Sequence, residues 1–339
     1  MNTTRPGIRG ILVFALLIMC FCAGCPQYAD PTVPNPIRPV KEPSTGNEYF
    51  VYVPSRNIPG EPCPLVILCH GTNPWDSALR QIRDWVGLAE DKNFIVAAPK
   101  LKGTRGDLPP SPEVQIRRQR EDERTILATV RHVSGANHID PTRVFLTGWS
   151  AGGYAVLHTG LRHPEVFRAL TIMQGNFDER FAADAEEHID PYQPVYVIYG
   201  TTDVLTGGQS KECMEWLYDH NAYVFDGQVS GPHRSHPKAA HEFFEKVIAE
   251  IPWLTVRATA ANASDPYTIT FKARASFTPA GYRWTLDEGN TSSAAEPSFK
   301  FEEGTHEVTL ETAMPNGKRL KRTIRVDVPY SLFPEKLDR

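Results

Sequence analysis

The stretch Arg143-Val-Phe-Leu-Thr-Gly-Trp-Ser-Ala-Gly-Gly-Tyr154 carries the strongest structural signal in the chain. Its apolar start predicts a strand, and the Ala/Val/Leu-rich residues that follow it predict a helix. A serine between two glycines at such a strand-to-helix turn forms a nucleophile elbow, in which the hydroxyl stands exposed above the sheet. The pattern therefore makes Ser150 the candidate nucleophile. A Gly/Ser turn in a doubly wound protein is the alternative.

Two backbone N–H groups are predicted to stabilise an oxyanion beside this serine. Ala151 begins the helix, where free N–H groups and the positive end of the helix dipole favour negative charge. The second donor follows Pro64-Leu-Val-Ile-Leu-Cys-His-Gly71, an apolar run typical of a central strand covered on both faces. We expect the donor to be the N–H of Thr72. His70 is expected to orient this loop, with a role as the base as the alternative.

A carboxylate that could orient a catalytic histidine follows the next buried strand but one. Pro194-Val-Tyr-Val-Ile-Tyr-Gly200 predicts that strand, and Asp203 comes directly after it. Asp203 is therefore the predicted acid of a triad, with a helix cap or turn aspartate as the alternative. Asp178, Asp184 and Asp190 are weaker rivals, because no strand delivers them to the site.

The base is predicted on the loop Gly231-Pro-His-Arg-Ser-His-Pro237, which precedes the last helix of this part of the chain. We prefer His233, because the glycine before it and the proline after it fit a loop that swings an imidazole over the sheet. His236 remains the alternative, and His241 is expected to pack inside the helix. The order Ser150, Asp203, His233 is that of the α/β-hydrolase triad.

Residues 46–251 resemble secreted α/β-hydrolases of the feruloyl/acetyl-xylan esterase and polyhydroxybutyrate depolymerase type. The matching features are His70-Gly71, Gly148-Trp-Ser-Ala-Gly-Gly153, Tyr199-Gly-Thr-Thr-Asp203 and Gly231-Pro-His233. The resemblance implies a mostly parallel, doubly wound sheet. It also implies hydrolysis of polysaccharide-linked acyl esters or of polyester or short-chain esters through an acyl-enzyme, with no cofactor and no metal. A serine peptidase of the same fold and a catalytically inactive surface-binding scaffold are the alternatives.

Two further stretches in this part of the chain allow local predictions. Residues 175–193 are irregular in pattern, and Gln174, Asn176 and Phe177 are candidates for lining a substrate pocket. The run Arg117-Arg-Gln-Arg-Glu-Asp-Glu-Arg124 predicts a solvated helix face with i,i+4 ion pairs. A patch for an anionic ligand is the alternative for this run.

The texture changes after residue 252. Short alternating strands separated by turn residues over 253–330 predict a small all-β, Ig-like sandwich. Tyr282-Arg-Trp-Thr-Leu-Asp-Glu-Gly289, followed by Phe301-Glu-Glu-Gly-Thr-His-Glu-Val-Thr-Leu310, resembles the PKD module. We expect Trp284 to be a buried core aromatic and the module to bind, space or dock. Residues 331–339 form a tail.

The first residues predict a targeting signal rather than a part of the folded structure. Arg5 and Arg9 precede a short apolar run, so residues 1–25 are expected to be an export signal. Its end resembles a bacterial lipoprotein cleavage box, which makes Cys25 a candidate for lipidation and membrane anchoring. Ordinary cleavage is the alternative. The chain is therefore expected at the outer surface or in the periplasm as a lipoprotein, or outside the cell.

The proline-rich residues 26–45 predict an extended tether that does not pack. After it, a length of 339 residues accommodates one large unit, 46–252, and the smaller sandwich. The net charge of -4 does not favour binding to nucleic acid. The expected partner is an ester substrate, in some cases polymeric, and the oligomeric state is left open.

Overall fold

The computed structural model describes residues 30–106, 111–190, 192–250, 252, 254–262, 264–275, 277–286, 289–314 and 317–330. The predicted export signal, Cys25 and the tail at 331–339 lie outside the described residues.

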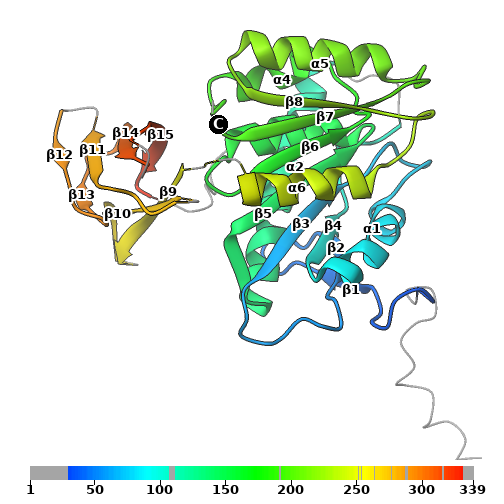
Figure 1. The fold of residues 1–339 in the computed structure, drawn as a ribbon, viewed down its shortest axis with the longest axis horizontal. Coiled ribbons are helices and arrows are strands. Elements are labelled where there is room, and N and C mark those ends of the chain that lie inside the picture. Colours follow the sequence, from blue (N-terminus) through cyan, green and yellow to red (C-terminus); the bar gives the residue numbers. More distant parts are fainter. Residues whose placement is uncertain are drawn as a thin grey trace, which may run out of the picture.

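An eight-stranded sheet forms the first unit (Figure 1). Its order is β1-β2-β4-β3-β5-β6-β7-β8; β3 to β8 run parallel, and β1 and β2 are antiparallel to their neighbours. The inner strands β3, β4, β6 and β7 are apolar over most of their length because helices cover both faces. The strands are β1 (Arg38–Lys41), β2 (Glu48–Tyr52), β3 (Cys63–Cys69), β4 (Ile95–Pro99), β5 (Ile139–Trp149), β6 (Ala169–Met173), β7 (Pro194–Gly200) and β8 (Tyr223–Val229).

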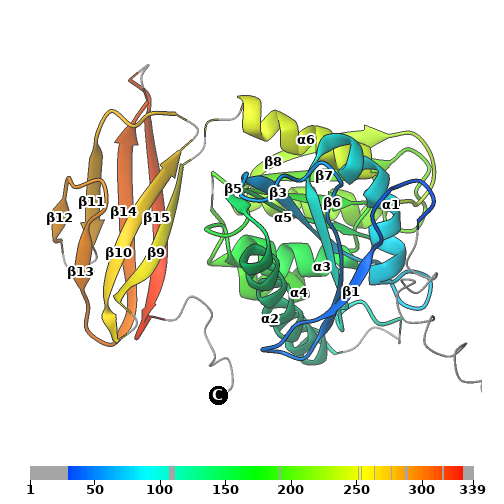
Figure 2. The same ribbon diagram turned by 90° about the horizontal axis from the view of Figure 1, so that it is seen from below.

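Helices pack on both faces of this sheet (Figures 1 and 2). One face carries α1 (Ala78–Lys92) and α6 (Pro237–Glu250), whose apolar sides join one buried cluster. The other face carries a second cluster and α2 (Pro112–Ala136), α3 (Gly152–Ala155), the π-helix Val156–Gly160, α4 (Glu179–Glu186) and α5 (Gly207–Asp219). The first unit therefore has the α/β-hydrolase fold that the sequence predicted.

The prediction of an unpacked tether is wrong for residues 33–42. Val33 and Ile37 are buried in the cluster under α1, and β1 pairs with β2. The prolines do not prevent this, because β1 lies at the edge of the sheet, where a missing N–H breaks no ladder between two strands. The buried carboxylate of Glu42 then accepts backbone N–H groups from Ser44 (3.0 Å) and Thr45 (2.6 Å) and fixes the turn into β2.

The charged run in α2 is only partly the solvated face that was predicted. Gln119, Asp122 and Glu123 within this run are buried. Burial raises the pKa of Asp122 to about 7, while its carboxylate accepts the backbone N–H groups of Lys102 (2.6 Å) and Gly103 (2.7 Å). The sequence pattern missed this because α2 packs against the loop after β4 as well as against the sheet.

Two antiparallel sheets form the second unit, which Figures 1 and 2 show as a separate body beside the first. Their orders are β13-β10-β9 and β12-β11-β14-β15. Trp284 is fully buried between them, and its indole N–H donates to Ala294 O (2.8 Å). The strands are β9 (Leu254–Asn262), β10 (Asp265–Ala275), β11 (Tyr282–Leu286), β12 (Thr291–Ser292), β13 (Ser298–Lys300), β14 (Gly304–Ala313) and β15 (Arg319–Val328).

Charged side chains connect the second unit to the segment between α4 and β7. Arg322 on β15 forms an ion pair with Asp190, and both side chains are buried. Arg325 pairs with Glu187 (3.3 Å) at the exposed edge of this contact. Over the described ranges, no helix is both long and apolar enough to cross a membrane.

Candidate active site

The turn after β5 holds Ser150 in a strained backbone conformation. Its φ is 53°, in the left-handed region that costs a non-glycine residue about 1–2 kcal/mol. The glycine on each side is required by close packing. A Cβ at Gly148 would lie 2.5 Å from Gly152 O, and one at Gly152 would lie 2.2 Å from Cys69 O at the end of β3. The elbow is therefore locked between β3 and the start of α3.

The loop after β3 lies against this serine. A Cβ at Gly71 would come within 3.3 Å of Ser150 Cβ, so a residue at this position packs closely against the serine. The Gly71 N–H donates to the buried carboxylate of Asp76 (2.6 Å), and the Asp76 N–H donates to Thr72 O (2.8 Å). These bonds fix the backbone at Gly71 and Thr72, beside the elbow.

His70 anchors the same loop from beneath. Its Nε2 accepts the backbone N–H of Leu101 (3.1 Å), and its Nδ1 lies 2.9 Å from Gly71 O. Nε2 is thus the acceptor and Nδ1 carries the proton. Burial lowers the pKa of this imidazole, which favours the neutral form that the bonding pattern requires. The structure therefore places His70 in the support of the loop.

Asp203 and His233 are brought together from two separate loops. His233 Nδ1 lies 3.0 Å from Asp203 Oδ2. The other carboxylate oxygen accepts backbone N–H groups from Leu205 (2.9 Å) and Thr206 (3.0 Å), and the Thr206 hydroxyl donates to Oδ2 (2.6 Å). Burial opposes ionisation, but the hydrogen bonds from Thr206 and His233 outweigh it and lower the pKa of Asp203. The carboxylate is thus charged and oriented toward the imidazole.

The imidazole of His233 lies over the elbow. Its ring stacks on that of Trp149, the residue before Ser150, with the centroids 5.2 Å apart. The Ser150 hydroxyl donates to Asn176 Oδ1 (3.4 Å), its one hydrogen bond to the described part of the chain. Asn176 is in turn held by Gln209 of α5, whose Oε1 accepts its side-chain N–H (3.0 Å). The structure therefore places Asn176 next to the serine.

His236 is held away from the acid. Its Nε2 accepts the amide N–H of Gln174 (3.3 Å), and its backbone N–H points to Met173 Sδ (3.4 Å). Burial and the nearby Arg234 lower its pKa. Of the two candidate bases, the structure thus brings His233 to Asp203. His236 instead helps to hold the loop in place through its contacts with Gln174 and Met173.

Gln174 does not line a pocket, contrary to the prediction. Its side chain is fully buried beneath the base loop, and its φ is 45°. Besides its bond to His236, its amide N–H donates to Pro232 O (3.2 Å), and its Oε1 accepts the N–H of Arg234 (2.5 Å). Its own carbonyl oxygen lies 2.9 Å from the hydroxyl oxygen of Thr206. One side chain therefore grips the chain on both sides of His233, which the sequence pattern did not reveal.

The remaining candidate residues have structural contacts of their own. Asp178 caps α4, which forms inside the segment that was predicted to be irregular, and accepts the N–H of Arg180 (3.0 Å). Asp184 pairs with Arg120 (2.7 Å), and Asp190 pairs with Arg322. Phe177, which was predicted to line a pocket, is buried beside Trp216. His241, which was predicted to pack, is buried and stacks on Phe94.

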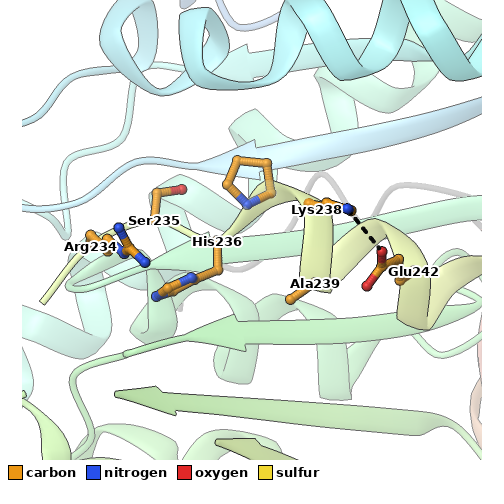
Figure 3. A pocket seen from close by; sticks show the side chains of 7 residues that line it. Arg234, Ser235, His236, Lys238, Ala239 and Glu242 are labelled. Carbon is orange, nitrogen blue, oxygen red and sulfur yellow. Dashed lines mark ion pairs between the residues drawn. The ribbon is translucent and has the colours of Figure 1, made fainter. Parts of the chain in front are cut away.

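An open depression of about 450 Å³ lies on the outer side of the base loop. Figure 3 shows its lining, with the imidazole of His236 beside Arg234 and an ion pair between Lys238 and Glu242 at the start of α6. No described group of three or more His, Cys, Asp or Glu side chains is placed to hold a metal ion. The elbow and the two loops beside it present a hydroxyl, an imidazole and a carboxylate.

Comparisons with known proteins agree with this fold. A model of the prolyl oligopeptidase family matches residues 85–216, which include Ser150 and Asp203 and end before His233. The chain is 24% identical over 211 residues to the bifunctional acetylxylan esterase/xylanase XynS20E of Neocallimastix patriciarum, over 59% of this chain and 28% of that protein. It is 26% identical over 181 residues to poly(3-hydroxyalkanoate) depolymerase C of Paucimonas lemoignei, over 51% of this chain and 41% of that protein.

Among solved structures, dipeptidyl peptidase 4 of Porphyromonas gingivalis is similar over 63% of this chain and 35% of that one. The TM-score is 0.48 and the identity 18%. The chain spans less than half the length of each of these proteins. It contains an α/β-hydrolase domain that has distant esterase and depolymerase relatives.

Proposed function

We propose that this chain is a serine hydrolase that cleaves carboxylic esters. The observation that carries the proposal is the contact between His233 and an oriented, charged Asp203 beside the strained elbow of Ser150. These are the three groups that nucleophilic acyl transfer requires, supplied by three loops at one edge of a parallel sheet.

In the reaction, Ser150 Oγ attacks the ester carbonyl carbon and its proton passes to Nε2 of His233. To do so the hydroxyl turns away from Asn176, where it rests in this structure. Asp203 holds the proton on Nδ1 and stabilises the imidazolium that forms. The imidazolium then protonates the departing alcohol, and water releases the acid from the acyl-enzyme by the same steps.

The developing oxyanion would accept the backbone N–H groups of Thr72 and Ala151. The loops that carry them are fixed by the contact of Gly71 with Ser150 and by the packing of Gly152 on β3. Donors that are already in place need no reorganisation during the reaction, and losing one costs about 3–4 kcal/mol in comparable sites.

The substrate class is inferred from the relatives. An acetylxylan esterase and a poly(3-hydroxyalkanoate) depolymerase are each similar to more than half of this chain. We therefore favour polysaccharide-linked acyl esters or polyester and short-chain esters. A serine peptidase is the second candidate, because the family model that matches residues 85–216 is that of the prolyl oligopeptidases.

The placement of the enzyme in the cell is a further part of the proposal. The first residues support export, and Cys25 would carry a lipid that anchors the chain at a membrane surface. The second unit, with the buried Trp284 and the PKD-like sequence, would space the catalytic unit or dock it on a polymer.

Turnover of p-nitrophenyl acetate, butyrate and ferulate beside a peptide anilide tests the proposal. We expect ester hydrolysis that is lost in Ser150→Ala, with slow or no release of the anilide. Hydrolysis of the anilide alone would replace the esterase with the peptidase. A chain that turns over none of these compounds would favour the inactive scaffold.

A further inference from the structure

A second cavity, of about 640 Å³, opens at the same edge of the sheet as Ser150. Its walls come from the turn before β2, the loop after β3, the start of α1 and the loop after β4. Because β3, β4 and β5 run parallel, the loops after all three strands meet at one edge. His70 and Asn73 line this cavity, and Gly71 between them touches the elbow, so the cavity and the elbow share one loop.

The lining of this cavity is positively charged, although the chain as a whole carries a net charge of -4. Its basic side chains are Lys100, Lys102 and Arg105, and its one acidic side chain is Glu48. Lys100 pairs with Glu48 (2.9 Å), and Lys102 pairs with Glu121 of α2 (2.5 Å). Arg105 has no ion pair within the described part of the chain, and its exposed guanidinium lines the cavity.

The loop that carries Arg105 is held firmly at the site. Asn73 donates its N–H to Thr104 O (2.9 Å), and Gly106 donates its own to Asn73 O (2.9 Å). A Cβ at Gly106 would lie 2.4 Å from Asn73 O and 3.1 Å from Thr72 Cγ2. Arg105 is thus attached to the segment that carries the proposed oxyanion donor, within one loop of the scissile bond.

From this arrangement we infer that the cavity binds a carboxylate carried by the substrate next to the ester that is cleaved. The inference rests on the proposed ester hydrolase function and narrows its substrate class to acidic esters. A guanidinium offers paired N–H donors that match the two oxygens of a carboxylate. Lys100 and Lys102 each hold a carboxylate of the protein, so Arg105 is the group that would pair with the substrate. The carboxylate could belong to a uronic acid in an acidic polysaccharide or to the acid end of a hydroxyalkanoate chain.

Binding to Ser150→Ala protein tests the inference without any turnover. The probes are a xylo-oligosaccharide bearing glucuronic acid, the same oligosaccharide without it, and a 3-hydroxybutyrate trimer, each titrated calorimetrically. We expect the acidic sugar to bind about five- to tenfold more tightly than the neutral one, with the gain shrinking at high salt. Arg105→Gln should remove most of the gain. The control Arg283→Gln removes the same charge from an exposed side chain on β11 and should keep it.

If only the trimer binds more weakly in Arg105→Gln, the cavity is still a carboxylate site, and the carboxylate it binds is the acid end of a polyester chain. Equal binding of all three probes, or equal effects of the two arginine variants, would overturn the inference. Activity separates this failure from that of the proposed function. An enzyme that cleaves neutral and acidic esters equally well lacks the subsite, whereas a chain that cleaves no ester lacks the function.

Discussion

Removing the hydrogen bonds between Gln174 and the base loop should slow catalysis far more than it weakens substrate binding. Gln174→Met keeps the buried volume and abolishes the hydrogen bonds to Pro232 O and Arg234 N, on either side of His233. A buried polar group that loses its partner costs about 1–3 kcal/mol, and water can reach part of this loop, so we take about 1 kcal/mol for each group. The free energy that favours the catalytic position of the His233 imidazole then falls by about 2 kcal/mol. The fraction of molecules with the imidazole in that position falls about 30-fold.

The assay is steady-state hydrolysis of an activated ester, together with urea unfolding of each variant. We expect kcat to fall about 30-fold with KM within about twofold, because the loss is in positioning the base rather than in holding the substrate. Gly200→Ala should also lower kcat, since a Cβ there would lie 2.3 Å from Gln174 Nε2 and 2.7 Å from Gly231 O at the start of the base loop. Both variants should retain the fold.

Gln193→Met is the matched control. Gln193 is also buried, and its amide also donates to two backbone carbonyls, Gly160 O (3.1 Å) and Phe167 O (2.9 Å), on the helix side of the sheet. We expect similar losses of unfolding free energy from Gln174→Met and Gln193→Met, but a loss of kcat only from the first. If both variants lose stability alike and both keep the kcat of the parent, the reasoning is refuted.

Three further outcomes follow from the contacts described above. His233→Ala should abolish hydrolysis of p-nitrophenyl acetate, whereas His236→Ala should keep it within about tenfold, and the reverse ranking would reassign the base. Gly152→Ala should lower the unfolding free energy in urea by about 3 kcal/mol or more, since its Cβ would meet a backbone oxygen of β3 at 2.2 Å; an unchanged midpoint would contradict that packing. Burial disfavours the His163 imidazolium, but its hydrogen bond to Glu123 prevails and raises its pKa from 6.5 to about 9. The stability that the His163–Glu123 interaction adds is therefore fully present below pH 6.5 and is lost as the pH rises through 9. Between these pH values, the unfolding free energy of the parent should fall more than that of Glu123→Gln.

The sequence predicted those parts of the site that local geometry determines. The elbow at Ser150 needs small residues on both sides, and a G-x-S-x-G pattern between a strand and a helix states that requirement within one short stretch. The positions of Asp203 and His233 could be predicted because each follows an element with a clear hydrophobic pattern. The parallel order of the strands then brings both loops to the same edge of the sheet.

The parts that were missed depend on contacts between distant segments. Gln174 resembles any polar residue at the end of a strand, and its role appears only when the loop from 231–237 closes over it. Asp122 sits among charges typical of a solvated helix, yet it is buried by the loop after β4. The prolines before residue 40 suggested a tether. Nothing in the local sequence indicates that this segment lies at the edge of a sheet, where prolines are tolerated.

The most direct test of the account is to locate the adduct left by a fluorophosphonate probe, using mass spectrometry of the digested protein. We predict one adduct per chain, on Ser150, that forms at least about a hundredfold more slowly in His233→Ala, because the hydroxyl then lacks its base. An adduct on any other residue, or rapid labelling of Ser150 without His233, would contradict the claim that these side chains work together.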